Sequence, residues 1–296
     1  MPELPEVETM VREVRSALVG RTIATVRLTH HDVLRGVAAR RLIHDLRGAT
    51  VDAVTRRAKH AVIRMGDHRL VVQPGMTGSL QTQDAPLDAD QRRYSVLQAT
   101  LDDGRLLIYH DVRRIGTLRL LDQKGWDQFS ARLGPEPLDP RFTPARLLEA
   151  FAGTRQAVKK ALMDQKLIVG VGNIYANEAL WAARIDPSQP ASTITLAQAT
   201  LLLRHVVRIL KAAIKSEGST IRNYRTGKGK SGKFQLALHV YGREGQPCDR
   251  CGSRLAGTHA IDGRITVFCW RCQGGQSDGR AGGQKKPKTK KRAIAS

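Results

Sequence analysis

The segment LMDQKLIVGVGNIYA, residues 162–176, places two glycines between two stretches of helical pattern. Apolar residues recur at helical spacing over residues 158–167 before the glycines and over residues 174–185 after them. Gly170 and Gly172 permit a tight turn between packed helices, because glycine adopts backbone angles that other residues avoid. The centre of the chain is therefore predicted to be a pair of packed helices.

Further helices are predicted on both sides of this pair. Thr143, followed by a proline, is typical of a helix start. Thr195 with Gln198 three residues later forms a capping box at the start of a long helix, residues 196–216. Residues 139–236 are thus expected to form an all-α domain.

The chain before residue 133 has a different pattern. Apolar residues at helical spacing predict one amphipathic helix that starts at Pro5. From Thr22 to about Leu121 the pattern changes to short β-rich runs separated by turn pairs, which predicts an antiparallel sandwich or barrel. The stiff segment LGPEPL, residues 133–138, interrupts both patterns and marks an interdomain linker. The predicted fold class is α+β: an N-terminal helix with an antiparallel β-sandwich in residues 1–132, followed by the all-α domain.

The charge of the chain indicates the class of its partner. Its 296 residues include 49 Lys and Arg against 27 Asp and Glu, which gives a net charge of +22. This excess favours a polyanion, although charge alone does not distinguish DNA from RNA or from an anionic membrane surface. No apolar stretch approaches the ~20 residues needed to cross a bilayer, and the N-terminus has no secretory pattern. We expect a cytoplasmic protein, associated with the nucleoid if its source is bacterial.

Two basic segments lack an apolar period. Residues 224–233 combine glycine with positive charge and are expected to form a mobile loop. Residues 274–296 are rich in Gly, Lys and Gln, so we expect a disordered tail that adds nonspecific affinity for nucleic acid.

All four cysteines lie in one segment, as Cys248-x2-Cys251 and Cys269-x2-Cys272. Two such pairs facing each other can place four thiolates in the tetrahedron that Zn²⁺ accepts. Disulfide pairing is the alternative, which the lack of a secretory pattern disfavours. Four protein ligands leave no open position for water, so the role of one Zn²⁺ here would be structural. Residues 237–273 are therefore predicted to be a zinc finger with a β-hairpin.

The N-terminus reads MPELPEV, residues 1–7. A small second residue such as Pro2 normally permits removal of Met1, which would leave a secondary amine at the chain end. Taken alone, Pro2 and Pro5 are explained by the start of the first helix. A chemical role for Pro2 therefore depends on the rest of the chain.

Six motifs occur in one order along residues 1 to about 273. They are PELPEVE (2–8), GMTGSL (75–80), LGPEP (133–137), the segment 162–176, VYGR (240–243) and the four cysteines. Together they closely resemble the formamidopyrimidine-DNA glycosylases, bacterial enzymes that act on oxidised purines. The resemblance implies a helix–two-turn–helix arrangement in the all-α domain, with damaged double-stranded DNA as the partner of a monomer.

The resemblance also implies a bifunctional reaction of base excision repair. The Pro2 amine attacks C1′ of a flipped nucleotide, the damaged base (8-oxoguanine or a formamidopyrimidine) leaves, and the Schiff base drives β- and then δ-elimination. By resemblance Glu3 is a proton donor at the sugar or the base. Lys59 and Arg264, the latter beside Gly263 at the expected hairpin tip, donate protons for β- and δ-elimination or clamp phosphates. An amine is required because only an amine forms a cationic Schiff base that acidifies the neighbouring sugar protons.

Other positions match DNA contacts of the family. Extruding a base costs on the order of a few kcal/mol of stacking, and a side chain must fill the hole. Met76, Arg113 and Ile115 match the residues that do so, with Ile115 standing where phenylalanine is usual. Isoleucine can wedge between bases but cannot stack, so we expect poorer lesion search or altered discrimination of the partner base. The remaining DNA-contact candidates are Lys159, Asn173 and Arg222, and the secondary candidates are Glu6 and Glu178.

Several of these residues have simpler explanations that the sequence leaves open. Asn173 with the amides of a helix start makes a natural phosphate cradle, and helix capping would also explain it. Met76 could fill a gap in the core. Lys59 could be a solvated surface lysine.

Two other functions remain open. Endonuclease VIII-type enzymes use the same amine chemistry on oxidised pyrimidines, but Leu4 argues against them because that branch usually has glycine there. A zinc-finger DNA-binding protein without turnover would keep the scaffold. Such a protein would have no use for Pro2, Glu3 and Lys59 together.

Overall fold

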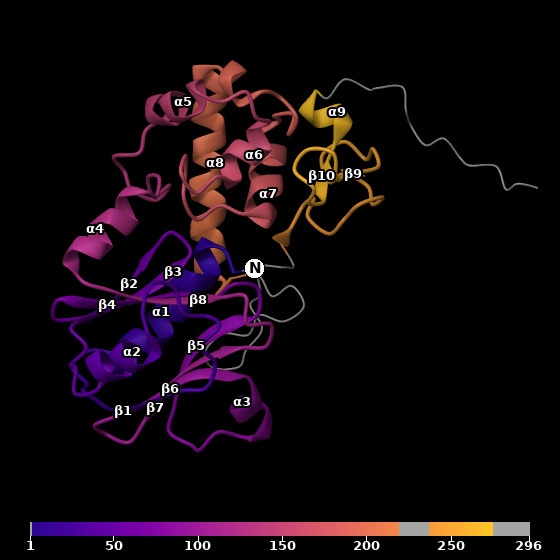
Figure 1. Cartoon of the computed structure of the whole chain (residues 1–296). Coiled ribbons are helices and arrows are strands. Elements are labelled where there is room, and N and C mark those ends of the chain that lie inside the picture. The colour runs from indigo at the N-terminus through magenta and orange to yellow at the C-terminus, as the bar shows by residue number, and fades with distance from the viewer. Residues whose placement is uncertain (1, 219–236, 275–296) are drawn as a thin grey trace, which may run out of the picture.

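The computed structural model describes residues 2–218 and 237–274. Within these residues, two β-sheets are followed by a group of helices and a small C-terminal hairpin (Figure 1). Arg222, the basic loop at 224–233 and the tail from 275 onward lie outside the described residues.

The N-terminal part is a sandwich of two four-stranded antiparallel sheets. One sheet has the strand order β1-β6-β7-β5 and the other has the order β2-β3-β4-β8. Apolar side chains from both sheets meet in one buried cluster, as the alternation of side chains along a strand allows. The predicted sandwich is confirmed, and its strands are β1 (Ile23–Leu28), β2 (Ala53–Arg57), β3 (His60–Met65), β4 (His68–Gln73), β5 (Gly78–Gln83), β6 (Ser95–Leu101), β7 (Leu106–Asp111) and β8 (Thr117–Leu121).

Three short helices accompany the sheets: α2 (Ala39–Leu46), α3 (Ala89–Tyr94) and α4 (Gln123–Ala131). Helix α4 begins at a cap, since Asp122 Oδ1 accepts a hydrogen bond from Gly125 N at 2.7 Å. It leads directly into the linker segment.

The helical part has its own core. Its capped starts are as predicted, because Thr143 Oγ1 accepts from Arg146 N and Thr195 Oγ1 accepts from Gln198 N. Among the described residues, no helix combines the length and the hydropathy needed to span a membrane. The helices are α5 (Pro144–Ala152), α6 (Val158–Met163), α7 (Asn173–Ala183), the 3-10 helix η1 (Ala191–Thr193) and α8 (Leu196–Lys215).

Helix α6 is shorter than the stretch predicted over residues 158–167. It ends at Met163, and the Asp164 side chain accepts a hydrogen bond from Lys166 N at 2.9 Å. Such a local side-chain bond offers the backbone an alternative to helix, which an apolar pattern does not reveal.

Helix α1 (Leu4–Leu18) belongs to both parts of the molecule. Leu4 packs in the core of the helices, whereas Val7, Val11 and Val14 pack in the core of the sandwich. The backbone N–H of Leu4 also donates to the carbonyl of Gly170 at 3.0 Å. The start of the chain is therefore held at the junction between the two cores.

The C-terminal hairpin consists of β9 (Ala256–Thr258) and β10 (Thr266–Phe268), followed by α9 (Trp270–Gln273). The strands are antiparallel, and residues 259–265 connect them. We refer to residues 259–265 as the tip loop. Gly263 within it has φ +76°, as expected for a tight turn.

Candidate active site

Glu3 lies just before α1 and is almost completely buried, with 3 % of its surface exposed. Its carboxylate accepts hydrogen bonds from Gly172 N at 2.5 Å and from Ile174 N at 2.9 Å. These amides belong to the turn before α7 and to its first residues, where a helix leaves N–H groups unpaired and favours negative charge. The start of one helix thus presents a carboxylate to the start of another.

These two bonds occupy the backbone amides expected to bind a phosphate near Asn173. Glu3 already uses the amides of Gly172 and Ile174. The Asn173 side chain does not cap α7, and its Nδ2 donates to the carbonyl of Ile265 in the tip loop at 3.1 Å. Asn173 therefore joins α7 to the tip loop, and a phosphate could use these amides only by displacing Glu3.

Lys59 lies in the turn between β2 and β3 and is also buried. Burial raises the pKa of the Glu3 carboxyl above its usual range, against the opposing effect of the Lys59 cation. Burial likewise lowers the pKa of the Lys59 ammonium, with Glu3 opposing that shift and Arg264 adding to it. Both shifts disfavour the charged form of the group, and shifts of this kind are common at sites of proton transfer.

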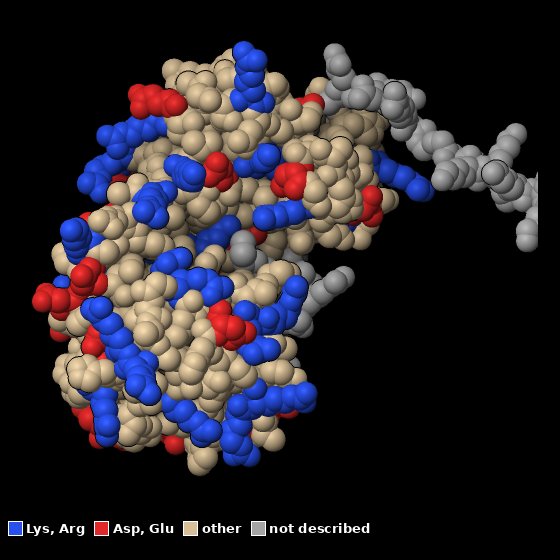
Figure 2. All heavy atoms as spheres, viewed as in Figure 1, with Lys and Arg blue, Asp and Glu red and all other residues tan. Residues whose placement is uncertain are grey.

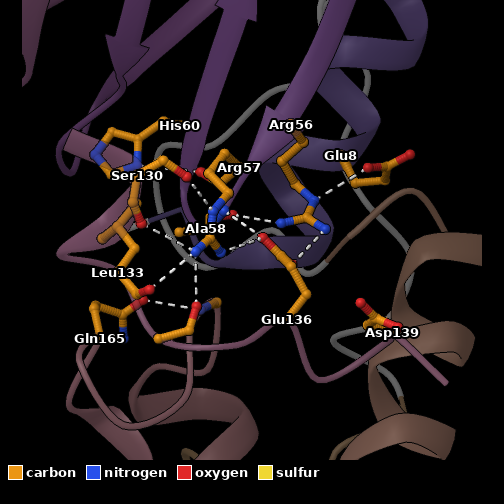
Figure 3. A network of polar contacts seen from close by, with 12 residues as sticks. Glu8, Arg56, Arg57, Ala58, His60, Ser130, Leu133, Glu136, Asp139 and Gln165 are labelled. Atoms are coloured by element: carbon orange, nitrogen blue, oxygen red, sulfur yellow. Dashed lines mark hydrogen bonds and ion pairs between the residues drawn. The ribbon is translucent and has the colours of Figure 1, made fainter. Parts of the chain in front are cut away.

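Contacts with the linker, residues 133–138, hold the turn that carries Lys59 in place (Figure 3). Glu136 accepts a hydrogen bond from Ala58 N at 2.7 Å and pairs with Arg57 at 3.1 Å and with Arg56 at 2.8 Å. Arg57 also donates to linker carbonyls, including that of Gly134 at 2.8 Å. Ala58 has φ +54°, an unusual value for a residue other than glycine, and the Glu136 bond helps to hold it there.

Glu6 is buried beside these groups. Its carboxylate accepts from Glu3 N at 2.9 Å and from the Tyr175 hydroxyl at 2.6 Å. These bonds connect α1 with α7 and indicate a structural role for Glu6.

The three wedge candidates lie together on two adjacent loops. Met76 and Ile115 are exposed by 44 % and 46 %, so the alternative of Met76 in the core is wrong. Arg113 Nη1 lies 3.3 Å from Met76 Sδ. Val112, which sequence reasoning missed, is an equally exposed apolar residue on the same loop.

Buried Asp111 ties the two loops together. Its carboxylate accepts from Thr77 Oγ1 at 2.5 Å and from Gly116 N at 2.9 Å. The backbones approach so closely at Gly75 and Gly116 that a side chain on Gly75 would overlap the Gly116 backbone. The exposed apolar side chains are therefore presented by a rigid base.

Lys159 lies differently from the position expected for a phosphate contact. Its side chain is completely buried, and its Nζ donates to Thr266 Oγ1 at 2.7 Å and to Asp262 Oδ1 at 3.2 Å. Arg264 in the same tip loop is exposed. Arg264 is thus exposed on the tip loop, and the buried Lys159 holds the loop in place from the protein interior.

The four cysteines form one cluster. Their sulfur atoms lie within 4.8 Å of one another, and Cys251 Sγ and Cys269 Sγ are 3.4 Å apart. That separation is far longer than a disulfide bond of ~2.05 Å and close to the ~3.8 Å expected in a tetrahedron of 2.3 Å metal–sulfur bonds. The cluster therefore fits a metal ion and not a pair of disulfides.

Glu178 on α7 accepts from the backbone N–H groups of His239, Val240 and Tyr241, each at 2.9 Å. The segment leading to the cysteines is thereby fastened to α7. This arrangement gives Glu178 an anchoring role.

Lys and Arg side chains gather along the hollow between the sheets and the helices (Figure 2). A hollow lined in this way attracts a polyanion. The start of α1 lies at this junction, where both cores meet.

Two family models match successive parts of the chain. The N-terminal domain of formamidopyrimidine-DNA glycosylase matches residues 1–118, and the H2TH domain of formamidopyrimidine-DNA glycosylase matches residues 133–225. A formamidopyrimidine-DNA glycosylase of Thermomicrobium roseum is 45 % identical over 291 residues, covering 92 % of this chain and 99 % of the relative. The chain belongs to the formamidopyrimidine-DNA glycosylase family. A second member, from Laribacter hongkongensis, is 44 % identical and is covered completely, along 92 % of this chain.

Solved structures of formamidopyrimidine-DNA glycosylases share the fold. The Lactococcus lactis enzyme, in a complex with DNA containing an abasic site, has a TM-score of 0.83 and 33 % identity over 92 % of this chain and 99 % of its own. The MutM protein of Thermus thermophilus has a TM-score of 0.81 and 35 % identity, with the same coverage. The predicted fold class is confirmed on this basis as well.

The site predicted from formamidopyrimidine-DNA glycosylase motifs comes together only in part. Glu3 and Lys59 lie at the junction, with Arg264 close enough to influence Lys59. Lys159 and Asn173 are hydrogen-bonded to the tip loop. Sequence reasoning missed Asp262 and Glu136, whose only local signals are the Asp-Gly turn at 262–263 and the acidic residue within the linker motif.

Proposed function

We propose that this protein is a bifunctional DNA glycosylase and AP lyase of base excision repair, acting on oxidised purines in double-stranded DNA. The observation that carries the proposal is the burial of Glu3, which follows Pro2 in the sequence, and of Lys59, whose charge acts on Glu3, at the junction of the two cores. Buried acid and amine groups with shifted pKa values are typical of proton-transfer sites. A DNA-binding module without turnover would have no need to desolvate both.

In the proposed reaction, Pro2 supplies the nucleophile after removal of Met1. Its nitrogen bonds to C1′ of the flipped deoxyribose while the bond from C1′ to the base breaks. Glu3, whose pKa is raised by burial, donates a proton to the sugar ring oxygen or the leaving base. The proline nitrogen loses its proton, and the bond from C1′ to the ring oxygen O4′ then breaks as O4′ takes up a proton. The product is a ring-opened iminium, which acidifies the protons on C2′.

The iminium then permits two eliminations. Loss of a C2′ proton expels the 3′ phosphate, and a second elimination expels the 5′ phosphate. We assign Lys59 and Arg264 to proton transfer or phosphate binding in these steps, since the first is buried beside Glu3 and the second is an exposed cation. Met76, Arg113 and Ile115 would fill the space of the flipped base, which their exposure on a rigid pair of loops supports.

Borohydride trapping on a duplex containing 8-oxoguanine tests the proposal. Reduction of the iminium should give a covalent protein–DNA adduct, which retention of Met1 should abolish because the Pro2 nitrogen is then part of a peptide bond. Pro2→Gly, which keeps a primary amine at the chain end, should slow trapping, and Glu3→Gln should slow it by at least ~10²-fold. Pro144→Gly, at the start of α5, is the matched control and should trap normally. An adduct that persists at the full rate when Met1 is retained would show that another group is the nucleophile. Trapping on an oxidised pyrimidine in preference to 8-oxoguanine would favour the endonuclease VIII type.

We also propose that Cys248, Cys251, Cys269 and Cys272 hold one structural Zn²⁺. Four thiolates at this spacing suit Zn²⁺ and leave no open coordination position, so the ion would organise the hairpin and take no part in the reaction. Removal of the metal by a chelator should release one zinc per chain and weaken DNA binding by at least ~10-fold, because the tip loop loses its support. Unchanged DNA affinity after complete zinc loss would contradict this role.

A further inference from the structure

A buried ion pair joins the tip loop to helix α6, and the proposed reaction does not use it. Lys159 of α6 is fully buried, and the Asp262 side chain in the tip loop is 5 % exposed. Their charged atoms lie 3.2 Å apart, although the two residues are separated by 103 positions in the sequence. The pair therefore joins the helical part to the hairpin at one point.

The same Asp262 oxygen also shapes the loop itself. Oδ1 accepts a hydrogen bond from Arg264 N at 3.0 Å, across Gly263 with its φ of +76°. A side chain that bonds the N–H two residues ahead fixes a tight turn. The direction in which Arg264 leaves the loop is therefore determined by Asp262.

Lys159 also contacts the loop on the C-terminal side of Arg264. Besides Asp262, its Nζ contacts the carbonyl of Ile265 at 3.3 Å and Thr266 Oγ1 at 2.7 Å. One ammonium thus contacts both ends of the short segment that contains Arg264. Buried charges of this kind are costly to desolvate and do not by themselves indicate stability, so a role in placing nearby groups is a better explanation than general stabilisation.

We propose that Asp262 is a positioning residue for Arg264, with Lys159 as its buried counter-ion, and that the pair controls the second elimination step. This inference rests on the proposed function, in which Arg264 acts in that step. Asp262 Oδ2 is buried and has no hydrogen-bond partner among the described residues, so the carboxylate depends on Lys159 for its neutralisation. Without Lys159, a bare carboxylate would remain beside the Arg264 backbone and draw its guanidinium away from the site.

The test compares Asp262→Asn, Lys159→Met and the double variant. Each single variant leaves one buried charge unpaired, and should lower the ratio of δ- to β-elimination product by ~10-fold or more, because displacements of ~1 Å can cost ~10²-fold in rate. Base excision and borohydride trapping should change less than threefold. The double variant removes both charges and keeps an amide oxygen for the Arg264 N–H, so its product ratio should return toward that of the wild type. Lys160→Met, on the neighbouring exposed residue of α6, is the matched control.

Two outcomes would overturn the inference. One is an unchanged product ratio in both single variants. The other is a double variant in which the two losses add, which would mean that Lys159 and Asp262 act separately. Lys159→Met made in an Arg264→Gln background excludes a direct role: a phosphate contact of Lys159 itself would reduce the salt slope of DNA binding by about 0.9 and also overturn the inference, whereas a role through Arg264 leaves the slope unchanged there.

Hydrogen exchange separates this inference from the proposed function. The Arg264 amide should exchange faster in Asp262→Ala than in the wild type, since its acceptor is lost, and zinc content should remain at the wild-type value. Arg264→Gln tests the catalytic assignment by itself. If Arg264→Gln left δ-elimination intact while Asp262→Ala still sped exchange, the reaction assignment would fail and the positioning of the loop would stand. Unchanged exchange in Asp262→Ala would refute the positioning.

Discussion

Two buried titratable side chains, Glu3 and Lys59, influence each other's ionisation. Glu3 and Lys59 each lose solvation, and each partly compensates the other. His60, next in sequence to Lys59, packs edge-on against Phe129 of α4 with ring centroids 5.2 Å apart. The catalytic candidate Lys59 is thus followed directly by a residue that desolvation keeps neutral.

The pH dependence of stability should report His60. Burial lowers its pKa from 6.5 to about 4, with Arg119, Arg57 and Lys59 adding repulsion. A group whose pKa falls on folding contributes stability that is fully present above the unfolded pKa and is lost progressively as pH falls from the unfolded pKa toward the folded pKa. We expect the free energy of unfolding to drop by about 2 kcal/mol from this group between pH 7.5 and pH 5.

Urea denaturation at the two pH values measures this change. His60→Gln has no imidazole to protonate, so its drop over the same range should be smaller by about that amount. His31→Gln, on an exposed residue, is the control and should behave as the wild type. Equal drops in His60→Gln and in the wild type would refute the assignment.

At the scale of elements, the sequence predicted what depends on neighbours along the chain. The caps at Thr143 and Thr195 are local signals, and the helices they start are present. The bonds from Glu3 to the start of α7 could not be predicted, because they join residues that are 169 and 171 positions apart. The buried state of Lys159 was missed for the same reason: its partner lies on an element that only the fold brings near.

A substitution in the turn between α6 and α7 tests the contact between Glu3 and the start of α7. A methyl group on Gly172 would overlap the Glu3 carboxylate, so Gly172→Ala should push Glu3 from its amides. We expect borohydride trapping to slow by at least ~10-fold, because the acid would no longer be aligned with the sugar.

Gly153→Ala is the matched control for this substitution. Gly153 ends α5 with φ −81°, and a methyl group there would meet open space. It should trap at the wild-type rate. If Gly172→Ala trapped as fast as Gly153→Ala, the contact between Glu3 and α7 would have no catalytic importance.

The whole molecule is organised around the junction of its two cores, and the linker contributes more there than its motif suggests. The sequence marked residues 133–138 as a stiff boundary, which explains a break between domains but not a contact. In the structure Glu136 binds the turn that carries Lys59, so the linker also acts as a clamp (Figure 3). Charge and motif could not reveal this, because either Arg56 or Arg57 could equally have faced solvent.

Glu136→Gln should therefore affect both stability and chemistry. Burial by itself opposes ionisation of Glu136, but Arg56, the Ala58 N–H and Arg57 together hold its pKa below the usual range. Loss of the charge leaves the two arginines without their shared partner, and we expect the free energy of unfolding to fall by about 2 kcal/mol. Trapping should slow as well, since the Lys59 turn loses its anchor, whereas Glu149→Gln on the exposed side of α5 should change neither quantity. Because the clamp joins the linker to the sandwich, a variant that lost stability yet trapped at the full rate would show that Glu136 holds the two parts together without placing Lys59.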